Sequence, residues 1–145
     1  DEIPPDSDTT YLETTGVADK SSSFSLTKIA TLGISGLIKA VQPWVEVKRV
    51  SGVGTNIGLR FISGASSVTH YALVIGTSYR AYYNLLTTDP NTGAAWKRKA
   101  LDFIEVGVRE QNTSIDRCTS AGCFVAYDDT VPSADDLILL PCLGA

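Results

Sequence analysis

The chain has 145 residues, of which 43% are hydrophobic and 19% are charged. This length fits one domain that buries roughly two thirds of the surface its unfolded form exposes. The net charge of -4 argues against a general nucleic-acid-binding role. No apolar run approaches the ~20 residues that span a bilayer. The totals therefore predict one globular domain that binds neither nucleic acid nor membrane.

Residues 1–9 are expected to form an extended N-terminal arm. Two prolines and four acids stand in the first eight positions, with little apolar material between them. Such a segment buries too little apolar surface to fold alone, and we expect it to order against a neighbour. Ile3, Pro4 and Pro5 are therefore candidate partner-docking residues.

From residue 11 onwards, short segments of alternating apolar and polar residues predict strands. They cover 11–13, 23–26, 33–42, 45–50, 56–62, 68–75, 79–86 and 104–109, and a further strand signal occurs at 124–127. Most are separated by glycine-rich or serine-rich turns. This spacing predicts an all-β protein, an antiparallel β-sandwich of jelly-roll-like or Greek-key type.

Two turn signals refine this expectation. Pro43 lacks a backbone N–H, so it predicts an edge position, a bulge or a corner that separates 33–42 from 45–50. Gly52 and Gly54 permit a tight reversal, which predicts a hairpin between 45–50 and 56–62.

One short helix is expected near 94–103, after the turn formers Asp89 to Gly93. Trp96, Ala100 and Phe103 recur at helical spacing and share a face, while the cations 97–99 crowd onto the other. We expect the aromatic face to plug one end of the β core.

After Glu110 the chain becomes more polar, and 111–145 is interpreted as a C-terminal extension on the sandwich domain 10–110. Four consecutive apolar residues stand near its end, and they require cover from the chain's own sheet or from a partner. These candidate docking residues are Leu137, Ile138, Leu139 and Leu140.

The three cysteines, Cys118, Cys123 and Cys142, all lie in this extension. Cys118 and Cys123 would close a tight loop if they formed a disulfide, and either one joined to Cys142 would pin the tail. One thiol is left over in each case. Free thiols are the main alternative, and a zinc site lacks a fourth ligand nearby.

Candidate catalytic groups are scarce. His70 is the only imidazole, and its alternating segment predicts an ordinary outward-facing strand residue. The acid pairs at 128–129 and 135–136 fit solvated turns better than a calcium or glycosidase site, because adjacent acids point in different directions. We therefore expect no enzyme activity, no metal site and no cofactor.

Two features support other classes of function. Tyr79, Tyr82 and Tyr83 form an aromatic group that is able to stack on a sugar ring, although core or inter-subunit packing is the commoner use. Asn112, Thr113 and Ser114 match the N-glycosylation acceptor, which would fit a secreted lectin-like domain.

Three blocks carry a resemblance to small structural proteins of tailed bacteriophages and prophages. They are residues 10–20, residues 34–42 continuing into 45–49, and the stretch 88–96 followed by 105–108. The last block is the most specific. Members of this family commonly end soon after the strand at 105–108, whereas this chain adds 112–145.

The resemblance implies a non-enzymatic virion structural protein, located in the virion, that acts as a capsid decoration or a fibre or tail accessory component. Its implied partners are other capsid or tail proteins and further copies of itself, as in a trimer. The alternative is a carbohydrate-binding or receptor-binding adhesin module on the same sandwich.

Overall fold

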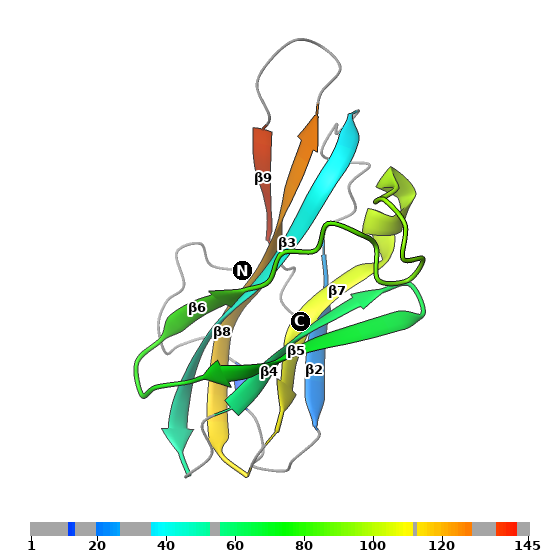
Figure 1. The fold of residues 1–145 in the computed structure, drawn as a ribbon. Helices are drawn as coiled ribbons and strands as arrows, with labels where there is room; N and C mark the ends of the chain where they lie inside the picture. Colours follow the sequence, from blue (N-terminus) through cyan, green and yellow to red (C-terminus); the bar gives the residue numbers. More distant parts are fainter. Residues whose placement is uncertain are drawn as a thin grey trace.

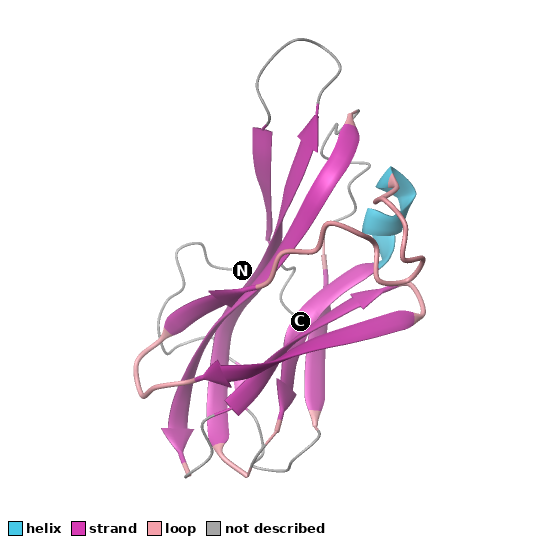
Figure 2. Cartoon of the chain, viewed as in Figure 1, coloured by secondary structure: helices cyan, strands magenta, loops and turns pink. Residues whose placement is uncertain are grey.

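The computed structural model describes residues 12–13, 20–26, 36–52, 56–111, 113–128 and 136–141. Two antiparallel sheets pack face to face, and a single short helix lies at one end of the described part (Figures 1 and 2). The predicted all-β antiparallel sandwich is confirmed. Within the described residues no helix is long and apolar enough to cross a membrane.

Five strands form the first sheet: β1 (Leu12–Glu13), β3 (Leu37–Ser51), β6 (Arg80–Tyr83), β8 (Ile115–Asp128) and β9 (Asp136–Pro141). Their order is β1-β8-β3-β6, and β9 also pairs with β8. Sequence-distant segments therefore meet at the centre of this sheet.

Four strands form the second sheet: β2 (Ser21–Ser25), β4 (Asn56–Ser63), β5 (Ser66–Val74) and β7 (Ile104–Glu110). Their order is β2-β7-β4-β5, and every pairing is antiparallel. The predicted strands at 23–26, 68–75 and 104–109 correspond to β2, β5 and β7.

The segment expected as an extension contributes an interior strand. β8 pairs with β3 from Leu37↔Asp128 to Ser51↔Ile115, and β1 and β9 attach to β8. A strand signal was expected only at 124–127, because the earlier half of β8 is polar. The 110/111 domain boundary stays a prediction, but residues 115–128 lie inside the sheet.

The prediction that Pro43 separates two segments is wrong. β3 runs through Pro43, which pairs with Cys123 with no register shift there. On the other side of β3, Val41 and Leu86 exchange two backbone hydrogen bonds, and Asn84 N donates to Pro43 O at 3.1 Å. The ladder thus loses only the bond that proline cannot donate.

The predicted hairpin between 45–50 and 56–62 is also wrong, because these segments lie in different sheets. Alternation alone does not tell a hairpin from a crossover between sheets. The hairpin is formed instead by β4 and β5, with Ser63 opposite Ser66 across a two-residue turn. Gly64 in this turn has φ +55, a conformation that glycine adopts readily.

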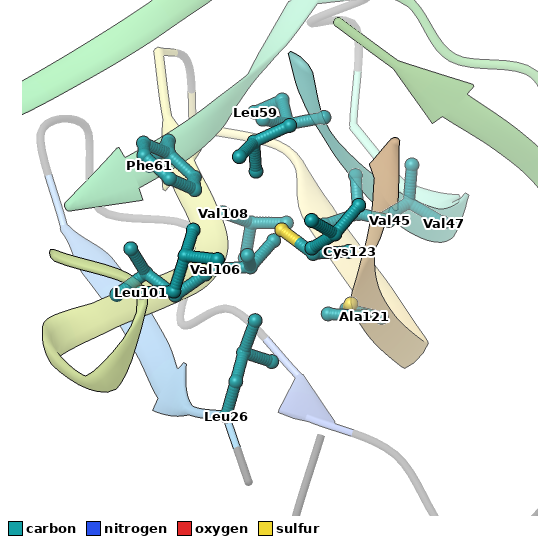
Figure 3. Packing of buried hydrophobic residues seen from close by; sticks show 14 of the residues in the cluster. Leu26, Val45, Val47, Leu59, Phe61, Leu101, Val106, Val108, Ala121 and Cys123 are labelled. Carbon is teal, nitrogen blue, oxygen red and sulfur yellow. The ribbon is translucent and has the colours of Figure 1, made fainter. Parts of the chain in front are cut away.

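The core lies between the two sheets (Figure 3). Over residues 41–47 of β3 the odd-numbered residues are buried. Of these, Val41, Val45 and Val47 meet Leu59, Phe61, Val106 and Val108 of the second sheet. Cys123 and Val125 of β8 join the same cluster. This alternation is the period-2 pattern of the sequence realised in three dimensions.

The helix is a 3-10 helix, η2 (Arg98–Phe103), shorter than the expected 94–103. Trp96, just before it, is 2% exposed, and its Nε1 donates to Leu86 O at 2.9 Å. Its ring meets Phe61 edge-on with centroids 6.0 Å apart. Phe103 is 60% exposed and Leu101 is buried instead. Leu101 is thus the core-facing residue of η2, and Phe103, two residues later, lies about 120° away from it around the 3-10 helix.

A buried carboxylate ties the turn before Trp96 to the β4–β5 hairpin. Asp89 is 3% exposed. Its Oδ1 accepts from Ser63 Oγ at 2.6 Å and from Asn91 N at 2.9 Å, and its Oδ2 accepts from Thr92 Oγ1 at 3.2 Å. The turn residues recognised in the sequence therefore act as one hydrogen-bonded unit that holds Trp96 over the core.

Replacing Trp96 with alanine should lower the free energy of unfolding by about 3–5 kcal/mol, as for other buried aromatics. Chemical denaturation measures this loss. Phe103→Ala is the matched control, and it should cost less than about 1 kcal/mol because this ring is exposed. Equal losses in the two variants would contradict the conclusion that Trp96, and not Phe103, covers the core.

At Gly107 of β7 the backbone of β2 leaves no room for a side chain. A Cβ at this position would overlap Ser22 O and stand 2.5 Å from Ser23 Cα. Backbone atoms cannot yield as a flexible side chain can. Glycine here is therefore a condition for β2 to pair with β7.

We expect Gly107→Ala to destabilise the protein by more than about 3 kcal/mol or to detach β2, because overpacking against a fixed backbone is costly. Gly76→Ala provides the control, since nothing lies within 4 Å of its added Cβ. Its effect should stay within about 1 kcal/mol. Thermal unfolding followed by circular dichroism compares the two, and a harmless Gly107→Ala would refute the close approach.

Candidate functional site

The outer face of the five-stranded sheet presents a run of aromatic and apolar side chains. Because Val41 and Val45 of β3 point into the core, Trp44 between them points to the opposite face. Tyr83 is the register partner of Trp44 on β6, and Phe124 of β8 lies 6.4 Å from the Trp44 ring, centroid to centroid. We call Trp44, Tyr83, Leu85 and Phe124 the outer-face strip.

Exposure is greatest at the β6 end of the strip. Tyr83 is 61% exposed and Leu85 is 58% exposed, while Trp44 and Phe124 are half-buried. Leu86 bonds to Val41 and faces the core, so Tyr83 and Leu85, at odd spacing from it, share the outer face. Register partners lie about 5 Å apart, so the strip is continuous across three strands.

The same face carries polar groups beside the strip. Glu46, two residues after Trp44, accepts hydrogen bonds at Oε2 from Thr119 Oγ1 at 3.4 Å and from Ser120 Oγ at 3.3 Å. Aromatic side chains with a polar margin are typical of protein–protein interfaces. This arrangement is suited to binding a protein partner.

The three tyrosines considered for glycan stacking have separate roles. Tyr79 lies under Lys48, whose Nζ is 4.4 Å from the ring centroid. Tyr82 packs partly buried against the core, and Tyr83 is exposed. The structure therefore leaves only Tyr83 of the three on the strip. Trp44, Leu85 and Phe124 were not singled out from the sequence, although the alternation on both sides of Pro43 would have placed Trp44 on an outer face.

The predicted docking segments are described only in part. Ile3, Pro4 and Pro5 lie outside the described residues. Leu137, Ile138, Leu139 and Leu140 belong to β9, whose backbone pairs with Gly122–Tyr127 of β8. Docking by these segments stays a prediction.

Cys118 and Cys123 are buried, with exposures of 4% and 0%. Both lie on β8, five residues apart in an extended strand, which separates their Cα atoms by about 16 Å at ~3.3 Å per residue. A disulfide needs no more than about 7 Å, so these two do not join each other. Cys142 lies outside the described residues, and its pairing stays a prediction.

The remaining candidate groups are dispersed. His70 is exposed on β5, as expected for a surface strand residue. Asp128 is exposed and pairs with Lys39 at 3.2 Å, and Asp136 begins β9. Asp129 and Asp135 lie outside the described residues. Within the described ranges no group of three metal-ligating side chains comes together.

A buried acid that sequence reasoning did not single out lies near the start of β8. Asp116 is 0% exposed and accepts from Ser114 Oγ at 2.9 Å. Burial raises the pKa of Asp116 above its ordinary 3.8, although the Ser114 hydrogen bond and the charge of Arg49 each lower it. The folded chain therefore binds this proton more tightly than the unfolded chain does.

The raised pKa of Asp116 determines the direction in which this group changes stability with pH. The contribution of Asp116 to the free energy of unfolding is largest at low pH. This contribution declines as pH rises above about 3.8 and passes the raised pKa of the folded chain. Asp116→Asn should remove this decline. The free energy of unfolding of the variant should therefore increase relative to that of the wild type as pH rises, by at most about 1.4 kcal/mol per pH unit. Asp128→Asn is the exposed control. Parallel pH profiles for wild type and Asp116→Asn in denaturant titrations would contradict the raised pKa.

Comparison with known proteins shows a distant likeness of fold. No protein-family model matches the chain, and no curated protein matches its sequence. Among solved structures, the PRD1 vertex protein P5 is similar at 16% identity with a TM-score of 0.39, over 82% of this chain and 72% of that chain. A likeness at this level carries no argument about function. The resemblance to tailed-bacteriophage proteins stays a prediction from the sequence.

Proposed function

We propose that the chain is a non-enzymatic structural component of a virus particle, located in the virion, that binds other virion proteins through protein–protein contacts. The finer role is a capsid decoration or a fibre or tail accessory protein. The resemblance of residues 10–109 to bacteriophage structural proteins motivates the class of protein. The sandwich fold is compatible with it.

The observation that carries the proposal is the outer-face strip. Tyr83 and Leu85 stand exposed beside Trp44 and Phe124 on the outer face of a rigid sheet. Aromatic residues on a rigid element lose little conformational freedom on binding, which makes them effective interface anchors. A contiguous exposed apolar strip marks an interaction site more often than a random surface does.

Electron microscopy of particles assembled with and without the chain tests the proposal. We expect additional density, with the five-stranded sheet turned towards a neighbouring capsid or tail protein. Unchanged particles with no density for the chain would exclude a virion role.

A paired substitution tests the surface itself. Tyr83→Asp with Leu85→Asp should abolish co-sedimentation of the chain with particles, because each places a charge in a desolvated contact. Val50→Asp is the matched control, since Val50 is also exposed, at 42%, near the far end of β3. Retained co-sedimentation of the Tyr83/Leu85 variant, once its fold is verified by circular dichroism, would assign the contact to another face.

A carbohydrate-binding or receptor-binding module is the second candidate. The exposed Tyr83 ring, with Trp44 beside it, is the observation that favours it, because a sugar ring can stack on an exposed aromatic face. A glycan array separates the two candidates. Specific retention of a glycan that is lost in Tyr83→Ala would favour the adhesin.

A further inference from the structure

The outer face of the four-stranded sheet differs in chemistry from that of the five-stranded sheet. Along β2, β4, β5 and β7 the residues that alternate with the buried ones are mostly serine, threonine and glycine. Among the described residues, Ile62 is the single large apolar side chain on this face. Protein–protein interfaces usually have aromatic or apolar anchors at their centre. This face is therefore suited to a hydrophilic ligand.

Arg60 is held on this face by hydroxyl groups of two other strands. Because Leu59 and Phe61 of β4 point into the core, Arg60 between them points outwards. Its Nη1 donates to Ser21 Oγ of β2 at 2.8 Å, and its Nε donates to Ser67 Oγ of β5 at 3.4 Å. These bonds fix the position of the guanidinium group on the sheet.

The path of the Arg60 side chain crosses β7, which lies between β4 and β2. Gly107 is the register partner of Arg60 on β7, so the crossing begins where β7 carries no side chain. A guanidinium carries several N–H donors in one plane, and the two bonds to serine occupy only part of them. The remaining donors are available to a ligand on the solvent side.

The two serines add donors of their own. A serine hydroxyl is both an acceptor and a donor, and here Ser21 and Ser67 each accept from Arg60. Within the described part of the chain neither hydroxyl makes a further side-chain hydrogen bond. Their O–H groups therefore remain able to donate beside the guanidinium, to the same oxygen atoms of an anion.

The charge of Arg60 is not neutralised by the chain. Glu105 is the single acid among the described residues of this face, and its Oε2 accepts from Ser23 Oγ at 2.5 Å. The described residues give Arg60 no ion pair with a carboxylate. Arg109, the register partner of Ser21, brings a second cation to the same face. This face is thus positive on a chain whose net charge is -4.

We propose that the outer face of the four-stranded sheet binds an acidic polysaccharide, with a sulfate or carboxylate group of the sugar against the Arg60 guanidinium and the hydroxyls of Ser21 and Ser67. Arginine pairs with such planar or multi-oxygen anions through parallel N–H bonds. Thr69, the register partner of Arg60 on β5, is placed to hydrogen-bond a sugar hydroxyl. This site is separate from the outer-face strip and does not depend on the virion role.

Isothermal titration calorimetry with the full-length chain tests the ligand class. The probes are heparin as a sulfated polysaccharide, polygalacturonate as a carboxylated one, dextran as a neutral one, polyglutamate as an acidic peptide and inorganic sulfate as the free ion. We expect heparin or polygalacturonate to bind at least tenfold more tightly than the other three. Binding of neither would overturn the proposal. Equal binding of polyglutamate would also overturn it, and equal binding of inorganic sulfate would show an adventitious ion only.

Variants locate the site. Arg60→Gln removes the charge, and Arg60→Lys keeps the charge but loses the planar fork, so both should weaken polysaccharide binding by roughly tenfold or more. Arg80→Gln is the matched control, because Arg80 is an exposed cation on β6 of the other sheet. An equal loss in Arg80→Gln would show general charge attraction and overturn the proposal.

A change that leaves every charge in place tests the role of the hydroxyls. Ser21→Ala with Ser67→Ala should weaken polysaccharide binding, because the guanidinium loses its two holding bonds and the ligand loses two donors. Unchanged binding would contradict the proposed site. Circular dichroism verifies the fold of each variant.

Nuclear magnetic resonance of the ¹⁵N-labelled wild type gives a readout that needs no variant. The Nε–H signal of Arg60 should shift and saturate as polysaccharide is added, while that of Arg80 stays in place. An unmoved Arg60 signal at saturating polysaccharide would overturn the proposal.

Discussion

The long antiparallel ladder between β3 and β8 is the constraint on which the rest of the structure depends. It joins residues 37–51 to residues 115–128, and β6, β1 and β9 are attached to one or other of its two strands. Because the ladder fixes which residues of β3 face the core, it also fixes that Trp44 faces outwards. The candidate interaction surface is therefore a consequence of core packing, since a one-residue slip would exchange the two faces.

The second sheet depends on different devices. Gly107 allows β2 to approach β7, and the carboxylate of Asp89 locks the turn that places Trp96 over Phe61. These contacts stabilise the end of the sandwich at which β7 begins, and η2 lies on the surface there. The outer-face strip lies on the other, five-stranded sheet.

The sequence predicted the parts of the fold that depend on local pattern. Alternation located most strands and the sandwich class, and the turn formers at 89–93 located the cap. Alternation did not predict the non-local pairing of 45–50 with β8. The first half of β8 is polar and therefore gave no strand signal. Pro43 misled because the pairing on that side of β3 keeps its register across the proline, from Trp44↔Tyr83 to Val41↔Leu86, and loses only the bond that proline cannot donate. The outer-face strip required the register of three strands, which no single segment contains.

Oxidative footprinting of the chain, free and bound to particles, tests the central claim that the outer face of the five-stranded sheet is the contact surface. In the particle-bound chain, hydroxyl-radical labelling of Tyr83 and Leu85 should fall strongly while Val50, near the opposite end of the same sheet, keeps its labelling. Equal labelling of Tyr83 and Leu85 in the free and bound states would contradict the account.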